Sequence, residues 1–149
     1  MPELIRSAVT RVRVYFKDRR QKPRLRVRLL FTVGIHRPSN GNGNGTRKAS
    51  DYLKGHTRDI STSGLALLVP RVHLNGHHLA ADGRELEIKL ELGRFGPINL
   101  RAVPRRYERL EDSELGCTYL IGVRIVHIDE ADLLNYTTFI KESLGSGAE

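Results

Sequence analysis

The chain has 149 residues, a length that suits one domain and can bury a hydrophobic core without disulfide bonds. Its formal net charge is +8, and residues 1–28, with ten basic and two acidic side chains, carry all of that excess. The remaining residues sum to zero. The sequence therefore predicts a neutral domain with a basic N-terminal arm, which points to a localised anionic partner.

The composition excludes several classes of protein. No apolar run approaches the roughly 20 residues that a membrane-spanning helix needs, and Arg6 interrupts the only candidate for a secretory signal. The single cysteine, Cys117, excludes an internal disulfide framework and fits a reducing compartment. We therefore expect a cytoplasmic protein without a membrane span.

The first third of the chain contains one ambiguous segment and one clear strand. Residues 1–18 fit both helical and strand spacing, so we assign them to an extension of uncertain structure. Apolar side chains at every second position predict a half-buried strand over residues 25–36. It stops at Pro38, and the Asn-Gly tract at 39–46 predicts a flexible hairpin loop.

Further short strands follow, and then one helix. Alternation and Gly, Pro or Asn turns predict strands over residues 52–60, 65–69, 86–92, 98–104 and 119–125. Asp129 can cap a helix with apolar positions at Leu133, Tyr136, Thr137 and Ile140, which closes at Gly145. Six or seven short strands and a terminal helix favour an antiparallel barrel or sandwich.

No catalytic constellation stands out. Ser61 has no histidine at a motif-defined spacing, Cys117 has no identifiable activating neighbour, and there is no glycine-rich phosphate loop. The group His73, His77, His78 and Asp82 lacks the spacing of a zinc site. We therefore expect a protein that is not an enzyme and has no cofactor or metal.

Two local patterns carry the functional argument, and the first is Arg20-x-x-x-Arg24, directly before the first clear strand. Guanidinium groups match phosphate oxygens and the O6/N7 edge of guanine. Pro23 stiffens this segment and disfavours a helix before it. Arg24 and Arg28 fit the same spacing, but Arg28 lies well inside the predicted strand, which favours the pair Arg20 and Arg24.

The second pattern is Asp59-x-Ser61-x-x-Gly64, at the turn between two predicted strands. A carboxylate can accept from the N1–H and N2–H₂ donors of guanine. Serine hydroxyls and turn N–H groups can bind phosphate, and Gly64 permits a backbone conformation that a Cβ would block. A guanine nucleotide with phosphates would satisfy both patterns.

These residues resemble the PilZ domain family, the bacterial receptor module for bis-(3′-5′)-cyclic dimeric GMP (c-di-GMP). Arg20 and Arg24 match its Arg-x-x-x-Arg segment, and Asp59, Ser61 and Gly64 match its Asp/Asn-x-Ser-x-x-Gly turn. The resemblance covers roughly residues 19–143. It departs from the family at Ser63, where glycine is frequent, and in the enlarged Asn-Gly loop.

The resemblance implies a mainly β fold, a six-stranded antiparallel barrel with a C-terminal helix and a basic N-terminal arm. We expect three parts: an extension at 1–18, the PilZ-like domain at 19–144 and a disordered tail at 145–149. The expected ligand-binding residues are Arg19, Arg20, Arg24, Asp59, Ser61, Ser63 and Gly64.

The same resemblance implies a role for each of these residues. Arg20 and Arg24 would hold phosphates and the guanine Hoogsteen edge, and Asp59 and Ser61 the other polar edges. Arg19 would stack on the second guanine if an intercalated ligand dimer binds. The expected output is ordering of the basic arm against the barrel, which signals to a downstream protein.

Two alternatives stay open. The barrel could bind single-stranded nucleic acid with its basic arm, although aromatic residues make up only 6% of the chain and tryptophan is absent, so a stacking platform is poorly supplied. It could also be a degenerate PilZ-like adaptor that binds only protein. The presence of both arginines and of Asp59 and Ser61 argues against the adaptor.

Overall fold

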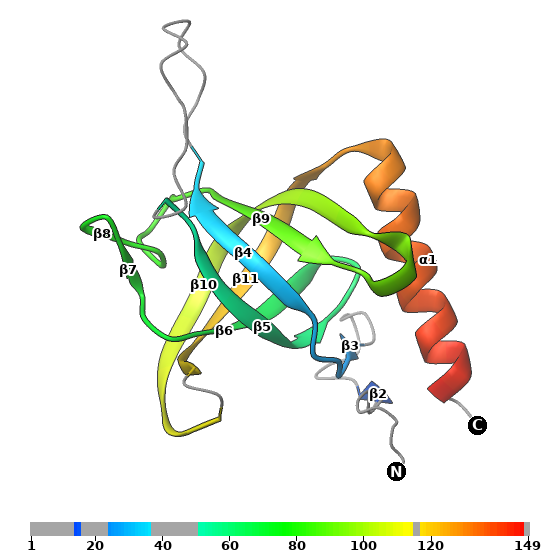
Figure 1. Ribbon diagram of the computed structural model, residues 1–149, viewed down its shortest axis with the longest axis horizontal. Helices are drawn as coiled ribbons and strands as arrows, with labels where there is room; N and C mark the ends of the chain where they lie inside the picture. The colour runs from blue at the N-terminus through cyan, green and yellow to red at the C-terminus, as the bar shows by residue number, and fades with distance from the viewer. Residues whose placement is uncertain (1–13, 16–23, 37–50, 115–116, 148–149) are drawn as a thin grey trace, which may run out of the picture.

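Six antiparallel strands close into a barrel, and one helix covers an end of it (Figure 1). The computed structural model describes residues 14–15, 24–36, 51–114 and 117–147. The barrel strands are β4 (Leu30–Ile35), β5 (Leu53–Ile60), β6 (Gly64–Val69), β9 (Leu86–Glu91), β10 (Pro97–Glu114) and β11 (Cys117–Ile128). The other elements are β2 (Val14–Tyr15), β3 (Arg24–Leu25), β7 (His73–Leu74), β8 (His77–His78), the 3₁₀ turn η2 (Gly93–Phe95) and α1 (Glu130–Gly147).

The barrel closes because β5 pairs on both of its sides. The strand order is β5-β4-β9-β10-β11-β6, and β6 pairs again with β5. All these pairings are antiparallel. The short strand β3 joins β5 through Leu25 and Ile60, and β2 pairs with β3. The predicted fold class, a six-stranded antiparallel barrel with a C-terminal helix, is confirmed.

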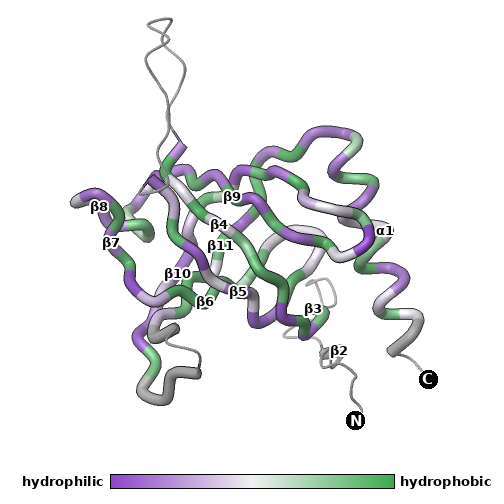
Figure 2. The backbone as a smooth tube through the Cα atoms, viewed as in Figure 1, coloured by the Kyte–Doolittle hydropathy of each residue, from purple (hydrophilic) through white to green (hydrophobic). Residues whose placement is uncertain are grey.

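The inward faces of the strands form the hydrophobic core. Apolar side chains alternate with polar ones along strands such as β9, and the tube in Figure 2 carries both green and purple segments. The core includes Leu65, Leu67 and Val69 of β6, Leu86, Ile88 and Leu90 of β9, and Ile98, Leu100 and Ala102 of β10. Each large apolar side chain contributes about 1.5–3 kcal/mol by leaving water.

The strand predicted over residues 25–36 is interrupted between β3 and β4. Thr57 fills the interruption: its Oγ1 donates to the carbonyl of Val27 (2.6 Å) and accepts from the N–H of Leu29 (2.9 Å). The N–H of Thr57 also donates to the carbonyl of Leu29 (2.9 Å). Leu25 and Val27 remain buried, so the apolar alternation survives without a continuous ladder.

The hairpin of β10 and β11 is longer than the predicted strands 98–104 and 119–125. In Figure 1 it projects beyond the barrel. Arg105–Arg109 are all exposed, so this part of β10 has no buried face to produce alternation. A second hairpin, β7–β8, was not predicted, and its turn at Asn75 and Gly76 adopts positive φ at both residues.

The predicted helix is confirmed, with small changes at its ends. Tyr136 and Ile140 are buried against the barrel, whereas Leu133 is 40% exposed. The helix continues to Gly147, so residues 145–147 are not part of the expected disordered tail, and 148–149 lie outside the described residues. Of the described helices, none is long and apolar enough to cross a membrane.

Other predictions fall largely outside the described residues. The Asn-Gly loop at 39–46 lies outside them entirely. Of the extension at 1–18, only β2 is described.

A substitution at Gly55 of β5 would test how closely β5 packs against β4 and β6. A Cβ there would meet the carbonyl oxygen of Leu68 and lie 2.8 Å from Cζ of Phe31. We expect Gly55→Ala to lower the free energy of unfolding by about 1–3 kcal/mol, as overpacking does, in urea denaturation. Gly145→Ala, where nothing lies within 4 Å, is the control and should not destabilise the protein. Equal stability of both variants would contradict this account of the barrel packing.

Candidate functional site

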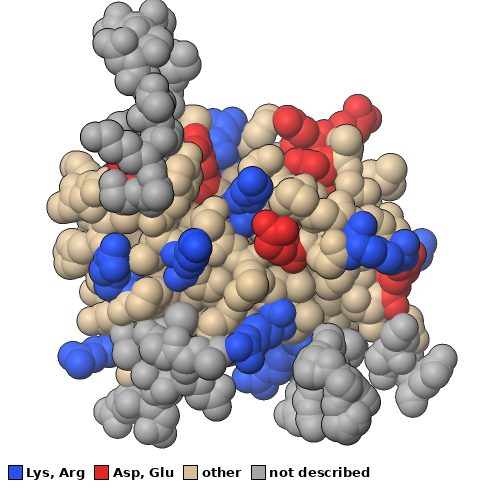
Figure 3. All heavy atoms as spheres, in the orientation of Figure 1, with Lys and Arg blue, Asp and Glu red and all other residues tan. Residues whose placement is uncertain are grey.

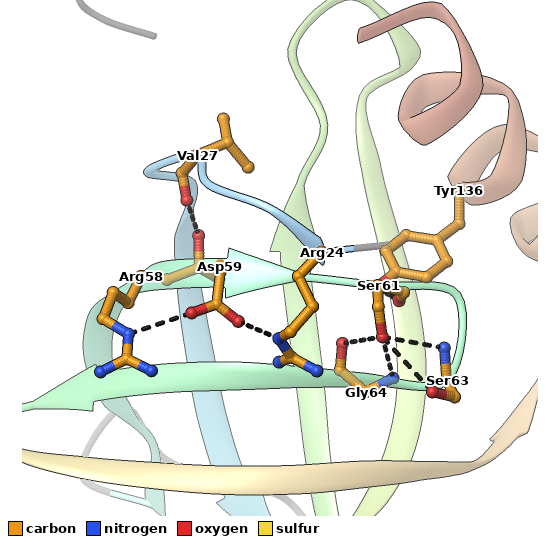
Figure 4. Close-up of polar contacts among 9 residues, drawn as sticks. Arg24, Val27, Arg58, Asp59, Ser61, Ser63, Gly64 and Tyr136 are labelled. Atoms are coloured by element: carbon orange, nitrogen blue, oxygen red, sulfur yellow. Dashed lines mark hydrogen bonds and ion pairs between the residues drawn. The ribbon is translucent and has the colours of Figure 1, made fainter. Parts of the chain in front are cut away.

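Five of the seven expected ligand-binding residues meet at one end of β5. Arg24 arrives on β3, Asp59 lies near the end of β5, and Ser61, Ser63 and Gly64 form the turn into β6 (Figure 4). The pairing of Leu25 with Ile60 places β3 beside this turn. Arg19 and Arg20 lie outside the described residues.

The carboxylate of Asp59 is completely buried and binds two guanidinium groups. Its Oδ1 accepts from Nε of Arg24 at 2.6 Å, and its Oδ2 accepts from Nε of Arg58 at 3.0 Å. A buried carboxylate requires such partners, because desolvation strongly disfavours an unpaired charge. The direct contact of Asp59 with guanine expected from the sequence would therefore require the arginines to move.

Arg58 is the residue that the sequence interpretation missed. In a regular strand, consecutive side chains point to opposite faces, so Arg58 and Asp59 would not meet. The pairing of β5 with β6 shifts register between Thr57 and Asp59, which is the signature of a bulge. The bulge lets Arg58 turn toward its neighbour. No signal in the sequence marks this bulge.

The hydroxyl of Ser61 stabilises the turn by accepting hydrogen bonds from its backbone. Its Oγ accepts from the N–H groups of Gly64 (3.2 Å) and Ser63 (3.3 Å). The N–H of Ser61 donates to the carbonyl of Gly64 at 2.8 Å. Ser61 is 1% exposed, whereas Ser63 is exposed. Of the two serines, Ser63 is therefore the one whose side chain a ligand can reach in this arrangement.

A side chain has no room at Gly64. Its φ is not positive, so the turn does not require the left-handed conformation here. A Cβ at Gly64 would instead meet the carbonyl oxygen of Val123 on β11. Glycine thus allows the backbones of β6 and β11 to approach closely at the start of their pairing.

Tyr136 joins helix α1 to the same turn. Its hydroxyl donates to the carbonyl of Ser61 at 2.5 Å, and its side chain is fully buried. Burial raises the pKa of Tyr136 well above its ordinary value; the nearby Arg24 opposes this rise and Asp59 adds to it. The phenol therefore stays protonated and keeps its donor. The spacing of Tyr136 in the sequence predicts only a buried position on the helix, not this hydrogen bond.

A groove of about 1280 Å³ lies elsewhere on the barrel, along β4, β9 and β10. None of the expected site residues lines it. Its charged lining residues include Lys54 and Lys89 but also Glu87 and Glu91, and Figure 3 shows both signs interspersed on the side of β4 and β9. A mixed lining gives no preference for an anion, so the arginine cluster at Asp59 is the better candidate site.

Among the described residues, the histidines near the β7–β8 hairpin do not form a metal site. Within the same residues, no group of three or more His, Cys, Asp or Glu side chains could hold a metal ion. His73 and His78 contact each other edge-to-face with ring centroids 4.9 Å apart, and His78 contacts Tyr107 in the same way. These rings pack on one another between the β7–β8 hairpin and β10.

This protein is a small antiparallel β-barrel domain with an arginine-bound aspartate beside a serine-glycine turn. The family model of the PilZ domain matches residues 18–141, so the chain belongs to the PilZ domain family. Among the curated proteins, none matches the chain.

Three solved structures share this fold. They are the PilZ domain of YcgR from Escherichia coli with c-di-GMP (14% identity, TM-score 0.58), the inhibitor of motility MotI/DgrA of Bacillus subtilis (17%, 0.56) and MrkH, a c-di-GMP-dependent transcription regulatory factor (19%, 0.57). The matches cover 88%, 86% and 85% of this chain respectively. The chain spans 95% of the YcgR domain, but only 52% of MotI and 51% of MrkH.

Removal of the Tyr136 hydrogen bond would test whether it holds α1 to the turn. Tyr136→Phe removes the donor and leaves a buried carbonyl unpaired, so we expect the free energy of unfolding to fall by about 1–3 kcal/mol. Chemical denaturation measures this. Tyr107→Phe, at a tyrosine that is 49% exposed, is the matched control and should have little effect. If both variants match the wild type, this hydrogen bond does not hold the helix to the turn.

Proposed function

We propose that this protein is a non-enzymatic, cytoplasmic receptor for c-di-GMP. The observation that carries the proposal is the cluster of Arg24, Asp59 and the turn Ser61–Gly64, which the pairing of β3 with β5 brings together. Membership of the PilZ family supports it, as does the similarity to a YcgR domain solved with c-di-GMP.

The ligand is a dianion with two guanine bases, and the site offers matching groups. Arg24 uses Nε for Asp59, which leaves its Nη donors for a phosphate or for the guanine O6/N7 edge. The exposed side chain of Ser63 can bind a further polar atom. Arg19 and Arg20, which precede β3, complete the cationic set in this proposal.

The proposed output is ordering against the barrel of the basic arm that precedes Arg24 and Leu25, since β3 is already paired with β5. Ligand phosphates neutralise part of the arm's charge, which lowers its self-repulsion and favours a fixed position. A downstream protein would then recognise the ordered arm or the barrel surface beside it. The bond from Tyr136 to Ser61 extends the same turn to helix α1, a second element that this partner could contact.

Titration calorimetry with c-di-GMP tests the proposed function. We expect binding in the low-micromolar range or tighter, weakened by salt. Arg24→Ala and Asp59→Ala should each raise Kd by a factor of ten or more, because removing a charge-assisted hydrogen bond costs about 1.5–3 kcal/mol. Arg71→Ala is the matched control: it removes the same charge beyond the far end of β6 and should bind like the wild type.

The same titration separates the alternatives. Absence of saturable heat with c-di-GMP, together with strongly salt-dependent binding of an oligonucleotide, would replace the proposal with a nucleic-acid-binding barrel. Absence of binding to either ligand would favour a protein-binding adaptor.

A further inference from the structure

We infer that Arg58 is a second ligand-binding arginine of this site, alongside Arg24, and that Asp59 acts by positioning both. This inference rests on the proposed binding of c-di-GMP. Neither the Arg-x-x-x-Arg segment nor the Asp-x-Ser-x-x-Gly turn includes Arg58. Its place follows from the bulge in β5.

The two guanidinium groups are held in the same way. Each donates its Nε hydrogen to one oxygen of the Asp59 carboxylate, at 2.6 Å for Arg24 and 3.0 Å for Arg58. Figure 4 shows the carboxylate between the two guanidinium groups, with the Nη atoms of each group turned away from the oxygen that its Nε contacts. Among the described residues, the hydrogen bonds from Arg24 and Arg58 to Asp59 both use Nε.

Exposure and charge favour an anion at this place. Asp59 is completely buried, whereas the side chains of Arg24 and Arg58 are 23% and 33% exposed. The carboxylate neutralises only one of the two cations, so the three residues keep a net positive charge at the surface. Two forks of N–H donors, fixed by a shared carboxylate, can bind a phosphodiester or one phosphate and one guanine edge.

The competing explanation is that Arg58 only compensates the buried charge of Asp59. In that case removing Arg58 destabilises the fold but does not change the affinity or salt dependence of the folded protein. A ligand contact changes both, because a cation that binds phosphate contributes to the salt slope. Arg58→Lys separates charge from geometry, since lysine keeps the charge but lacks the planar fork.

The experiment is titration calorimetry with c-di-GMP at several salt concentrations, on the wild type, Arg58→Gln, Arg58→Lys and the control Arg71→Gln. We expect Arg58→Gln to raise Kd by about tenfold or more, in line with loss of a charge-assisted contact. The slope of log Kd against log salt should fall by about one. Arg58→Lys should keep the slope but raise Kd severalfold, and Arg71→Gln should match the wild type.

Each outcome decides a separate point. If the wild type does not bind c-di-GMP, the proposed function fails and the inference fails with it. If the wild type binds but both Arg58 variants keep its Kd and salt slope, only the inference is overturned. If circular dichroism shows that Arg58→Gln does not fold, the Arg58→Lys variant decides the question. A raised Kd for Arg58→Lys supports ligand binding by the planar guanidinium group of Arg58, and a wild-type Kd overturns the inference.

Discussion

The buried carboxylate of Asp59 is the constraint on which the site depends. A carboxylate removed from water must be compensated, and removing one partner of a buried ion pair costs about 3–5 kcal/mol. Arg24 approaches from β3 and Arg58 from the bulge in β5, so one carboxylate fixes both groups. Because Arg24 precedes the barrel, the same interaction fixes the path of the chain as it enters the domain.

Segments far apart in the sequence meet beside this carboxylate. Arg24 lies 35 residues before Asp59, and Tyr136 lies 75 residues after Ser61. The turn at Ser61 uses its own hydroxyl and N–H groups internally and gives its carbonyl oxygen to Tyr136. A ligand that binds the arginines therefore acts on groups that already connect the entering chain, the barrel and the helix, which is the arrangement a receptor needs to transmit binding.

The sequence was sufficient wherever one face of a strand is buried, because burial produces alternation. This is why barrel strands such as β9 could be predicted, whereas the helix followed from its own apolar spacing and the turn from its Asp, Ser and Gly residues. It was insufficient where backbone geometry departs from regular pairing. The interruption between β3 and β4, where Thr57 hydrogen-bonds to the backbone, preserves the apolar alternation and so cannot be predicted from it. The exposed end of β10 has no apolar alternation from which a strand could be predicted. Arg58 reaches Asp59 only through a bulge, and Tyr136 looks like any other buried helix residue.

The geometry also bears on how the site would meet its ligand. Arg24 and Arg58 each donate from Nε to Asp59. A ligand that binds their Nη groups would therefore not require these ion pairs to break. Two long side chains that would otherwise lose rotamer entropy on binding, about 0.5–1.5 kcal/mol each, are already held in place. In the proposed receptor, Asp59 would therefore serve affinity by fixing its neighbours. A contact with guanine through the carboxylate itself would forfeit this advantage, because the buried oxygens would first have to release their donors.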